Sequence, residues 1–342
     1  MKIRYTALAS VQLLTLPGVA LAQNTVPVTV GTFTRAETDR YISANVKEAG
    51  GLGKLHHARE PASIDNQTII RMNRDTLYSF GVFDLAAGPA TITLPDASKR
   101  FMSMMIASED HYVPFVFYDA KPHTLTQKNV GTRYVTVAIR TLVDPNDPKD
   151  VAEVHRLQDA IRVSQPGGPG KLELPNWNPT SLDEIRNALL VLAKHNPTFG
   201  HAFGTRTQVD PIEHLIGTAA GWGGNPDKDA SYANFAPIKN DGKIIYRLTV
   251  PKNVPVRSFW SVSVYNAKGF FEKNPYDAYS VNNITGQKSA DGSVMIQFGG
   301  CDGKIPNCLP IMDGWNMAAR MYRPKPEILT GKWKFPEPQQ VN

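Results

Sequence analysis

Residues 93–106 read TLPDASKRFMSMMI, and about 156 residues later residues 249–264 read TVPKNVPVRSFWSVSV. Each copy predicts a strand, a proline-closed turn and a second strand, because proline donates no ladder hydrogen bond and belongs at strand ends. β-branched and aromatic residues favour the pleated segments on either side. A spacing this long exceeds a solenoid period and predicts two similar β-domains in one chain. A chance likeness between two ordinary hairpins is the alternative interpretation.

The composition is that of a folded protein with more than one domain. The chain has 342 residues, of which 42% are hydrophobic and 20% charged, so it can bury a sizeable core. The 26 glycines and 26 prolines suit a turn-rich β protein. The net charge of +6 comes from scattered residues, without a basic run that alternates with aromatic residues. We therefore expect no nucleic-acid partner.

The N-terminus predicts a cleavable signal peptide at residues 1–22. Lys2 and Arg4 precede a mostly apolar stretch at 7–20, and Ala20 and Ala22 supply the small residues that signal peptidase needs. We expect cleavage after Ala22 and a periplasmic or secreted mature protein. A membrane anchor is the alternative, but the stretch is short and polar for a span of about 20 helical residues. No other stretch approaches that length, so we expect no membrane span after signal removal.

Two cysteines, Cys301 and Cys308, are the only ones in the chain. In an oxidising compartment this spacing predicts a disulfide that closes a small loop. A metal or redox site with two thiols is the competing interpretation. It lacks a Cys-x-x-Cys spacing and nearby histidines.

The order of predicted elements gives three regions after the signal peptide. Residues 23–145 form an N-terminal β domain whose leading helix begins with a capping box at Thr34 and stops at Gly50. Residues 146–235 form a helical connecting region, with helix starts at Asp147, Ser181 and Asp210. Residues 236–342 form a C-terminal β-sandwich. The expected fold class is mainly β with helical additions (α+β, multidomain): two β-sandwich or jelly-roll-like domains joined by a helical region.

Several short motifs carry a family resemblance over nearly the whole mature chain. The C-terminal motifs are FWSVSVY at 259–265, NPYD at 274–277, YSVN at 279–282 and RMYRPKP at 320–326, and they resemble the domain of unknown function 1214. Upstream, NRDTLYS at 73–79 resembles its usual partner, the domain of unknown function 1254. The resemblance implies an exported protein of β-sandwich or jelly-roll-like domains joined by helices. It implies no common reaction.

The segment around residue 75 is the best candidate for a ligand site. On a strand, Arg74 and Tyr78 would face the same way and share a cleft wall, with Asn73 facing the other way. Arginine can hold a carboxylate or phosphate, and tyrosine can hydrogen-bond or stack. Ion pairs of Arg74 and Asp75 that lock the domains together are the alternative interpretation. Four further candidates could face an interdomain groove: Tyr265, Asn282, Arg320 and Tyr322.

Two functions remain open from the sequence. The first is a binding protein that holds a small polar ligand or a protein partner in a cleft between the β-domains, without a cofactor or metal. The second is a cell-envelope enzyme, a hydrolase or lyase, that uses Asp75, Glu109 or His111 as acid or base beside Arg74. The sequence lacks the common nucleophile, zinc and phosphate-loop motifs. Homo-oligomer formation is compatible with β-sandwich edges, but no interface is identified.

Overall fold

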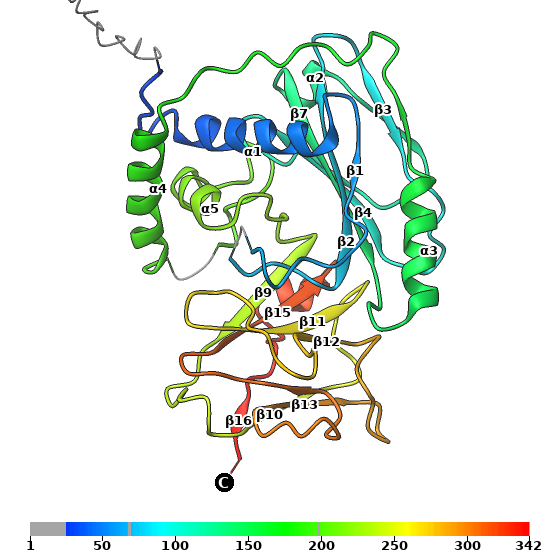
Figure 1. Ribbon diagram of the computed structural model, residues 1–342, viewed down its shortest axis with the longest axis vertical. Helices are drawn as coiled ribbons and strands as arrows, with labels where there is room; N and C mark the ends of the chain where they lie inside the picture. Colours follow the sequence, from blue (N-terminus) through cyan, green and yellow to red (C-terminus); the bar gives the residue numbers. More distant parts are fainter. Residues whose placement is uncertain (1–24, 68–69, 197–198, 342) are drawn as a thin grey trace, which may run out of the picture.

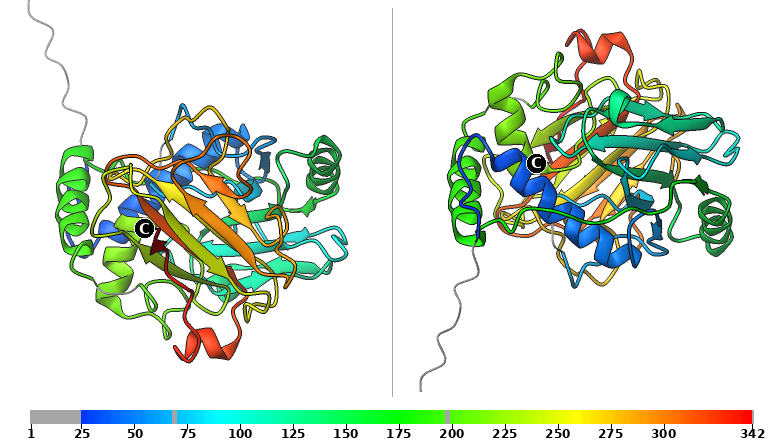
Figure 2. Two further views of the ribbon diagram at one scale, coloured as in Figure 1. Left: turned by 90° about the horizontal axis from the view of Figure 1, so that it is seen from below. Right: turned by 90° about the horizontal axis from the view of Figure 1, so that it is seen from above.

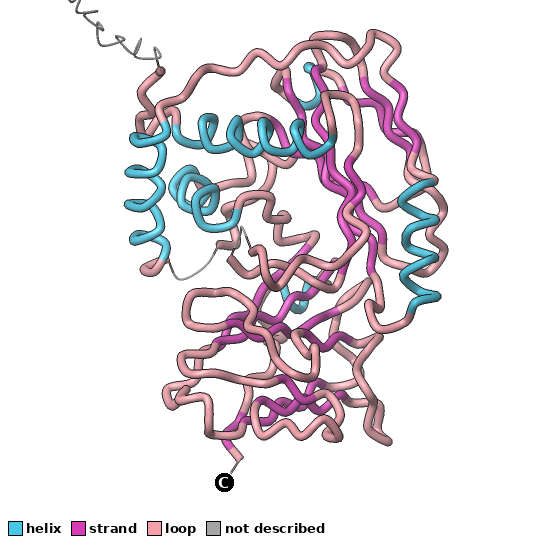
Figure 3. Tube along the Cα trace, in the orientation of Figure 1, coloured by secondary structure: helices cyan, strands magenta, loops and turns pink. Residues whose placement is uncertain are grey.

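The computed structural model describes residues 25–67, 70–196 and 199–341. The predicted signal peptide at 1–22 lies outside these described residues. The described chain forms an upper and a lower β-sandwich, with helices beside the upper one and the C-terminus at the bottom (Figure 1). Coloured by secondary structure, the strands gather in these two sandwiches and helices lie on both sides of the upper one (Figure 3). The expected mainly-β fold with helical additions is confirmed.

The N-terminal sandwich consists of a larger and a smaller sheet. The larger sheet has the order β1 (His56–His57), β2 (Thr76–Asp84), β7 (Tyr134–Leu142), β4 (Met102–Ser108) and β5 (Phe115–Phe117). The smaller sheet has the order β6 (Pro122–Leu125), β3 (Ala90–Thr93) and β8 (Arg162–Ser164). Alternate residues of the larger sheet, such as Phe83, Met104 and Ile139, are fully buried in the core of this sandwich. The opposite face of the larger sheet is therefore free to contact the rest of the molecule.

The C-terminal sandwich also consists of two sheets. One has the order β12 (Ser280–Asn282), β11 (Trp260–Tyr265), β15 (Asn316–Tyr322) and β9 (Ala230–Phe235). The other has the order β14 (Cys308–Leu309), β13 (Val294–Phe298), β10 (Tyr246–Val250) and β16 (Gln339–Gln340). Val262, Ile296 and Trp315 are fully buried in its core. The predicted boundary at residues 235 and 236 falls at the end of β9, which pairs with β15 and so belongs to this sandwich.

The two sandwiches share one topology. The order β2-β7-β4-β5 matches the order β9-β15-β11-β12, strand for strand in chain sequence, and β3 pairs with β6 as β10 pairs with β13. The repeated sequence marks one equivalent step in each copy, from β3 to β4 and from β10 to β11. In both copies the two strands lie in different sheets, so the proline-containing loop is a crossover rather than a hairpin turn. The repeated strand pattern thus indicates that a unit of about six strands is duplicated in the chain.

Most helices flank the N-terminal sandwich. They are α1 (Phe33–Ala49), α2 (Gln127–Val130), α3 (Pro148–Asp159), α4 (Pro179–Ala193) and α5 (Pro211–Gly221). The short α6 (Pro326–Leu329) belongs to the C-terminal sandwich, whose core includes Ile328. α3 and α4 lie on opposite flanks of the molecule, as the views from below and above show (Figure 2). α1, α4 and α5 pack on one another around Phe33, Leu182 and Ile216. No helix in the described ranges is long and apolar enough to cross a membrane.

The starts of α3, α4 and α5 follow local capping chemistry, whereas the predicted capping box at Thr34 is wrong: α1 begins at Phe33, after Thr32, without a side-chain cap. Asp147 and Asp210 cap α3 and α5 as expected, each accepting backbone N–H groups of the first turn. α4 begins earlier than the predicted start at Ser181, because Asn178 accepts the Ser181 N–H and Pro179 opens the helix. α1 ends at Gly50, whose φ of 69° is a left-handed conformation that glycine adopts without strain.

The predicted disulfide is present between Cys301 and Cys308. It links the residue that begins β14 to the loop before it, at one edge of the sheet that holds β10 and β13. The disulfide therefore lies in the sheet formed by β14, β13, β10 and β16, not in the sheet that contains β9, β11 and β15.

Candidate functional site

A row of three polar side chains crosses the N-terminal sheet. Tyr78 on β2 lies opposite Arg140 on β7, and Arg140 lies opposite Ser103 on β4. Residues directly opposite in antiparallel strands project from the same face. Their strand neighbours Ile139 and Met104 point into the sandwich core, so this row points away from it, towards the C-terminal sandwich.

The C-terminal sheet carries the same three residues at matched positions. Tyr232 on β9 lies opposite Arg320 on β15, and Arg320 lies opposite Ser261 on β11. Val262, beside Ser261, belongs to the core of this sandwich, so the second row points out of that core. The two rows thus present the same Tyr, Arg and Ser side chains on the outward face of each sandwich.

Arg140 is a buried cation without an acidic partner. Its side chain donates to the Gly223 carbonyl at 2.9 Å, and to Asn225 Oδ1 at 3.4 Å. Its guanidinium also lies 5.3 Å from the Tyr78 ring centroid, within cation–π range. The residue is 7% exposed, and among the described residues it forms no ion pair with a carboxylate. A desolvated charge is costly unless it is paired.

Arg320 occupies the equivalent position and is 4% exposed. Its Nη1 donates to Ser263 Oγ at 3.0 Å, and its Nη2 donates to the Arg71 carbonyl at 2.7 Å and to the Tyr265 hydroxyl at 2.6 Å. These acceptors are neutral. In the described part of the chain, no carboxylate forms an ion pair with this guanidinium either, although the charge of Asp75 reaches it.

Two buried aspartates stand at matched positions, three residues before the tyrosine of each row. Asp75 accepts from Ser280 Oγ at 3.1 Å and from Asn282 Nδ2 at 3.2 Å, and both donors belong to the C-terminal sandwich. Asp229 accepts from the Tyr118 hydroxyl at 2.8 Å, across the interface in the opposite sense. In each aspartate the second carboxyl oxygen, Oδ2, is buried and has no hydrogen-bond partner in the part of the chain that the structure describes. Such atoms call for an explanation, because buried polar atoms are nearly always paired.

The tyrosines of the interface differ in acidity. Burial alone would raise the pKa of Tyr78, but the charge and hydrogen bond of Arg140 outweigh it and lower the pKa. Burial and the neighbouring Tyr78 raise the pKa of Tyr322 well above its ordinary value. The Tyr322 hydroxyl accepts from Asn73 Nδ2 at 2.7 Å. The two phenols thus differ in pKa because the charge and hydrogen bond of Arg140 act on Tyr78, whereas burial and Tyr78 dominate at Tyr322.

Of the seven predicted ligand residues, six meet at this interdomain region and Arg74 does not lie with Tyr78. Arg74 precedes β2 rather than lying on it, and its guanidinium donates to the Ala62 carbonyl and lies 4.9 Å from the Tyr279 ring. The expected shared wall of Arg74 and Tyr78 is replaced by the row of Tyr78 and Arg140. Asn73, Tyr265, Asn282, Arg320 and Tyr322 contact one another or Asp75 through the bonds described above.

The predicted acid and base candidates lie in separate networks. Glu109 pairs with Arg35 at 3.2 Å. His111 is fully buried. Its Nδ1 donates to Thr218 Oγ1 at 2.9 Å, because that hydroxyl already donates to the His214 carbonyl, and its Nε2 accepts the Gly223 N–H at 2.9 Å.

Burial and the nearby His214 lower the pKa of His111 to about 3. Both of its ring nitrogens are already engaged, so His111 is a structural residue here. No hydrogen bond joins Asp75 to Glu109 or His111 among the described residues. The described ranges also contain no group of three or more His, Cys, Asp or Glu placed to hold a metal ion.

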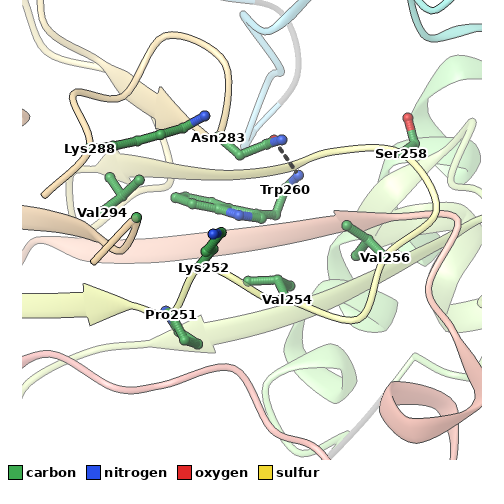
Figure 4. A pocket seen from close by; sticks show the side chains of 10 residues that line it. Pro251, Lys252, Val254, Val256, Ser258, Trp260, Asn283, Lys288 and Val294 are labelled. Carbon is green, nitrogen blue, oxygen red and sulfur yellow. Dashed lines mark hydrogen bonds between the residues drawn. The ribbon is translucent and has the colours of Figure 1, made fainter. Parts of the chain in front are cut away.

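A separate pocket lies on the C-terminal sandwich, beside the crossover from β10 to β11 (Figure 4). It has a volume of about 230 Å³, and Lys252, Trp260 and Lys288 are among its lining residues. Figure 4 shows the Asn283 side chain bonded to the Trp260 backbone at 3.0 Å, which fixes one wall. This pocket belongs to one domain and holds no orphaned buried charge, so the interdomain rows are the stronger candidate site.

The sequence did not predict five residues of this site: Arg140, Asp229, Tyr232, Ser103 and Ser261. A signal existed for all of them except Arg140: FMS at 101–103 matches FWS at 259–261, and DTLY at 75–78 matches DASY at 229–232. Comparison of the two halves beyond the proline loops would have found both patterns. The arginines carry no such local signal, because Arg140 and Arg320 align only through strand pairing.

Two family models match the chain. Residues 52–112 match the family described as "Protein of unknown function (DUF1254)", and residues 233–326 match "Protein of unknown function (DUF1214)". The chain carries both domains, in that order. The DUF1254 match includes Asp75 and Tyr78, and the DUF1214 match includes Ser261 and Arg320. Arg140 lies beyond the DUF1254 match, in the same sandwich.

Solved structures share the fold of this DUF1254–DUF1214 chain. The VPA0106 protein from Vibrio parahaemolyticus is 17% identical with a TM-score of 0.68, covering 92% of this chain and 98% of that one. An uncharacterized protein from Burkholderia cenocepacia is 12% identical with a TM-score of 0.52, covering 91% and 87%. At these identities the likeness concerns the fold alone. No curated protein matches the sequence.

Proposed function

We propose that this protein binds a small anionic ligand between its two β-sandwiches, with Arg140 and Arg320 as anchors. Arginine holds carboxylate and phosphate groups through a rigid fork of N–H donors. The tyrosine of each row adds a hydroxyl and an aromatic face. The ligand is small and polar, as its surroundings are buried hydroxyl, amide and guanidinium groups.

The observation that carries this proposal is the state of Arg140. A buried guanidinium that donates to neutral acceptors and forms no ion pair within the described part of the chain is an expensive arrangement for a purely structural residue. An anion would supply the missing counter-charge. Tyr232, in the second row, is 44% exposed, which supports access from solvent.

The orphaned carboxyl oxygens refine the ligand chemistry. Oδ2 of Asp75 and Oδ2 of Asp229 each have spare acceptor capacity. A hydroxyl or amino group on the ligand would satisfy one of them. We therefore favour a hydroxy or amino acid, or a phosphorylated polyol, over a bare inorganic anion.

The enzyme hypothesis built on Asp75, Glu109 or His111 beside Arg74 has less support. His111 has both ring nitrogens engaged, and Arg74 is held by the Ala62 carbonyl and the Tyr279 ring. We further propose that the protein acts outside the cytoplasm. The Cys301–Cys308 disulfide supports this location, because disulfides persist in oxidising compartments.

The test is a thermal-shift titration of the wild-type protein and of Arg140→Gln with phosphate, acetate, lactate and glycerol phosphate at constant ionic strength. A ligand at 100 times its Kd adds about 2.7 kcal/mol to the stability, which is a melting shift of several degrees. We expect the wild-type protein to respond and Arg140→Gln to respond more weakly, because one of the two arginine anchors is lost. Without ligand, Arg140→Gln should melt no lower than the wild type, because it removes an unpaired buried charge.

Arg156→Gln is the matched control. Arg156 is 62% exposed on α3 and pairs with Glu153, so its loss should leave the anion response intact. If Arg140→Gln lowers the melting temperature without ligand and keeps the full wild-type anion response, Arg140 is an interdomain strut and the proposal is wrong. Absence of any anion response in the wild type would refute it as well.

A further inference from the structure

Each sandwich offers the same four polar side chains to the interface. The positions match in strand order and register: β2 with β9, β7 with β15, and β4 with β11. The N-terminal set is Asp75, Tyr78, Arg140 and Ser103, and the C-terminal set is Asp229, Tyr232, Arg320 and Ser261. Sequence divergence has changed most other residues of these strands, for example Met105 to Ser263. The anionic site is therefore built twice, once by each domain.

The two sets face each other about an approximate two-fold axis. In an isologous interface, equivalent residues near the axis contact each other and all other contacts occur in reciprocal pairs. Phe101 and Phe259 are equivalent, each preceding the serine of its row by two residues, and their ring centroids are 5.2 Å apart. Asp75 accepts from donors on β12, and Asp229 accepts from Tyr118, directly after β5. β5 and β12 are equivalent strands, so these contacts are reciprocal.

The guanidinium groups of Arg140 and Arg320 interact electrostatically with the same tyrosines. Both charges lower the pKa of the Tyr78 phenol, and Tyr322 raises the pKa of both guanidinium groups. The two rows lie close to each other across the axis, because Phe101 and Phe259, each two residues before the serine of its row, are in ring contact. Two like charges in one buried region repel, and the repulsion is greatest where water is excluded.

The surrounding charges leave the region positive. Burial lowers the pKa of the Arg71 guanidinium, and the nearby charge of Arg320 lowers it further. Arg323 lies 4.3 Å from the Tyr118 ring. Against these four arginines stand the two aspartates of the matched sets, and burial raises the pKa of Asp229. A single anionic group on the ligand would leave one guanidinium without a counter-charge.

We infer that the ligand carries two anionic groups, one held by the Tyr78–Arg140–Ser103 row and the other by the Tyr232–Arg320–Ser261 row. This inference rests on the proposed function and adds the substrate class, a dicarboxylate or a bisphosphate of small size. Each row binds one end, and the approximate two-fold symmetry of the protein matches the two ends of the ligand. The aspartates accept hydrogen bonds from hydroxyl or amino groups between those ends.

The test compares paired ligands by calorimetric or thermal-shift titration at constant ionic strength. The ligands with two separate anionic groups, called dianions here whatever their net charge, are malonate, succinate, glutarate, malate, aspartate and fructose 1,6-bisphosphate. Each is paired with a ligand of similar size that has one such group, called a monoanion, such as butyrate for succinate and fructose 6-phosphate for the bisphosphate. In the wild-type protein we expect at least one dianion to bind about tenfold or more tightly than its monoanionic partner.

The variants assign the two ends. Arg140→Gln and Arg320→Gln should each reduce the preference for the dianion to about onefold while monoanion binding to the remaining row persists. Arg156→Gln should leave the preference unchanged. Tyr78→Phe and Tyr232→Phe keep both aromatic rings and remove one hydroxyl each, so they test the same equivalence if an arginine variant does not fold. We expect these two variants to weaken dianion binding by similar factors.

The outcomes separate this inference from the proposed function. Equal binding of paired mono- and dianions would overturn the two-ended ligand and leave the single anionic site standing. Loss of binding in one arginine variant, with no effect in the other, would do the same. If no anion of either kind binds the wild-type protein, both are wrong.

Discussion

At the residue scale, buried charge explains most of the unusual chemistry in this molecule. Within the described residues, Arg140 and Arg320 are buried without carboxylate partners, and Asp75 and Asp229 each keep one oxygen without a hydrogen bond. His111 shows the opposite case, because both ring nitrogens are paired. Residues with unmet polar capacity are candidates for ligand contact, whereas satisfied ones hold the fold. Sequence patterns alone do not distinguish the two.

The buried carboxyl group of Asp39 should make the stability of the protein depend on pH. This effect is separate from the ligand site. Its Oδ2 accepts the Trp177 indole N–H at 2.7 Å, and burial, followed by the nearby Glu109, raises its pKa to about 7 even though Trp177 and Arg35 oppose the shift. In the unfolded chain an aspartate titrates near 3.9. The folded state therefore holds more protons between about pH 4 and pH 7, so this group's contribution to stability falls as the pH rises through that window.

The measurement is the urea-unfolding free energy of the wild-type protein and of Asp39→Asn at pH 5 and pH 8. Asparagine keeps an acceptor for Trp177 and cannot ionise. We expect the variant to lose less stability than the wild type between the two pH values. Equal changes in the two proteins would show that Asp39 is not the titrating group.

At the element scale, the edge strand β1 depends on one close backbone approach. The chain before β1 runs along β2, where the Gly53 N–H donates to the Val82 carbonyl at 2.8 Å. A side-chain carbon added at Gly81 would lie 2.2 Å from the Lys54 carbonyl oxygen, which is too close for any real contact. β2 also carries Tyr78 of the candidate site, so the packing of this edge bears on the first row.

Gly81→Ala should therefore destabilise the N-terminal sandwich by about 1–3 kcal/mol, the usual cost of overpacking. Gly31→Ala is the matched control. Gly31 has no other chain atom nearer than 3.9 Å to an added carbon, and that atom is the Thr29 hydroxyl oxygen. Denaturant unfolding of both variants measures the difference. Equal stability of the two would show that the segment before β1 moves aside freely.

At the scale of the whole molecule, aromatic side chains couple the two sandwiches. Phe259 is 1% exposed, and its ring stacks on Tyr322 at 4.2 Å and meets the edge of Phe101 at 5.2 Å. Phe101 comes from the N-terminal sandwich, so this cluster crosses the interface between the domains. Together with the reciprocal bonds of Asp75 and Asp229, it predicts that the two domains unfold as one unit.

Phe259→Ala should cost about 3–5 kcal/mol and split the single calorimetric transition into two, because it removes the centre of the interface. Phe298→Ala provides the contrast. Phe298 is fully buried inside the C-terminal sandwich, so its loss should destabilise that domain without removing the contact between domains. Two transitions in the wild-type protein, or one in Phe259→Ala, would show that this cluster does not couple the domains.

The sequence by itself determined the local structure and the duplication. Proline at the strand ends, the aspartate caps of α3 and α5 and the spacing of Cys301 and Cys308 act over short distances, so each is legible in a short window. The motif around residue 75 and the motifs after residue 259 likewise identified the two domains. The six predicted residues that meet at the interface came from these motifs.

Only the tertiary structure decided which side chains share a site. Arg74 and Tyr78 lie four residues apart and separate because Arg74 precedes β2, whereas Arg140 joins Tyr78 through the pairing of β2 with β7. Arg320 meets them only because the two sandwiches face each other across an approximate two-fold axis. Strand pairing and domain packing depend on contacts between residues that are far apart in the chain, and short sequence windows contain no record of those contacts.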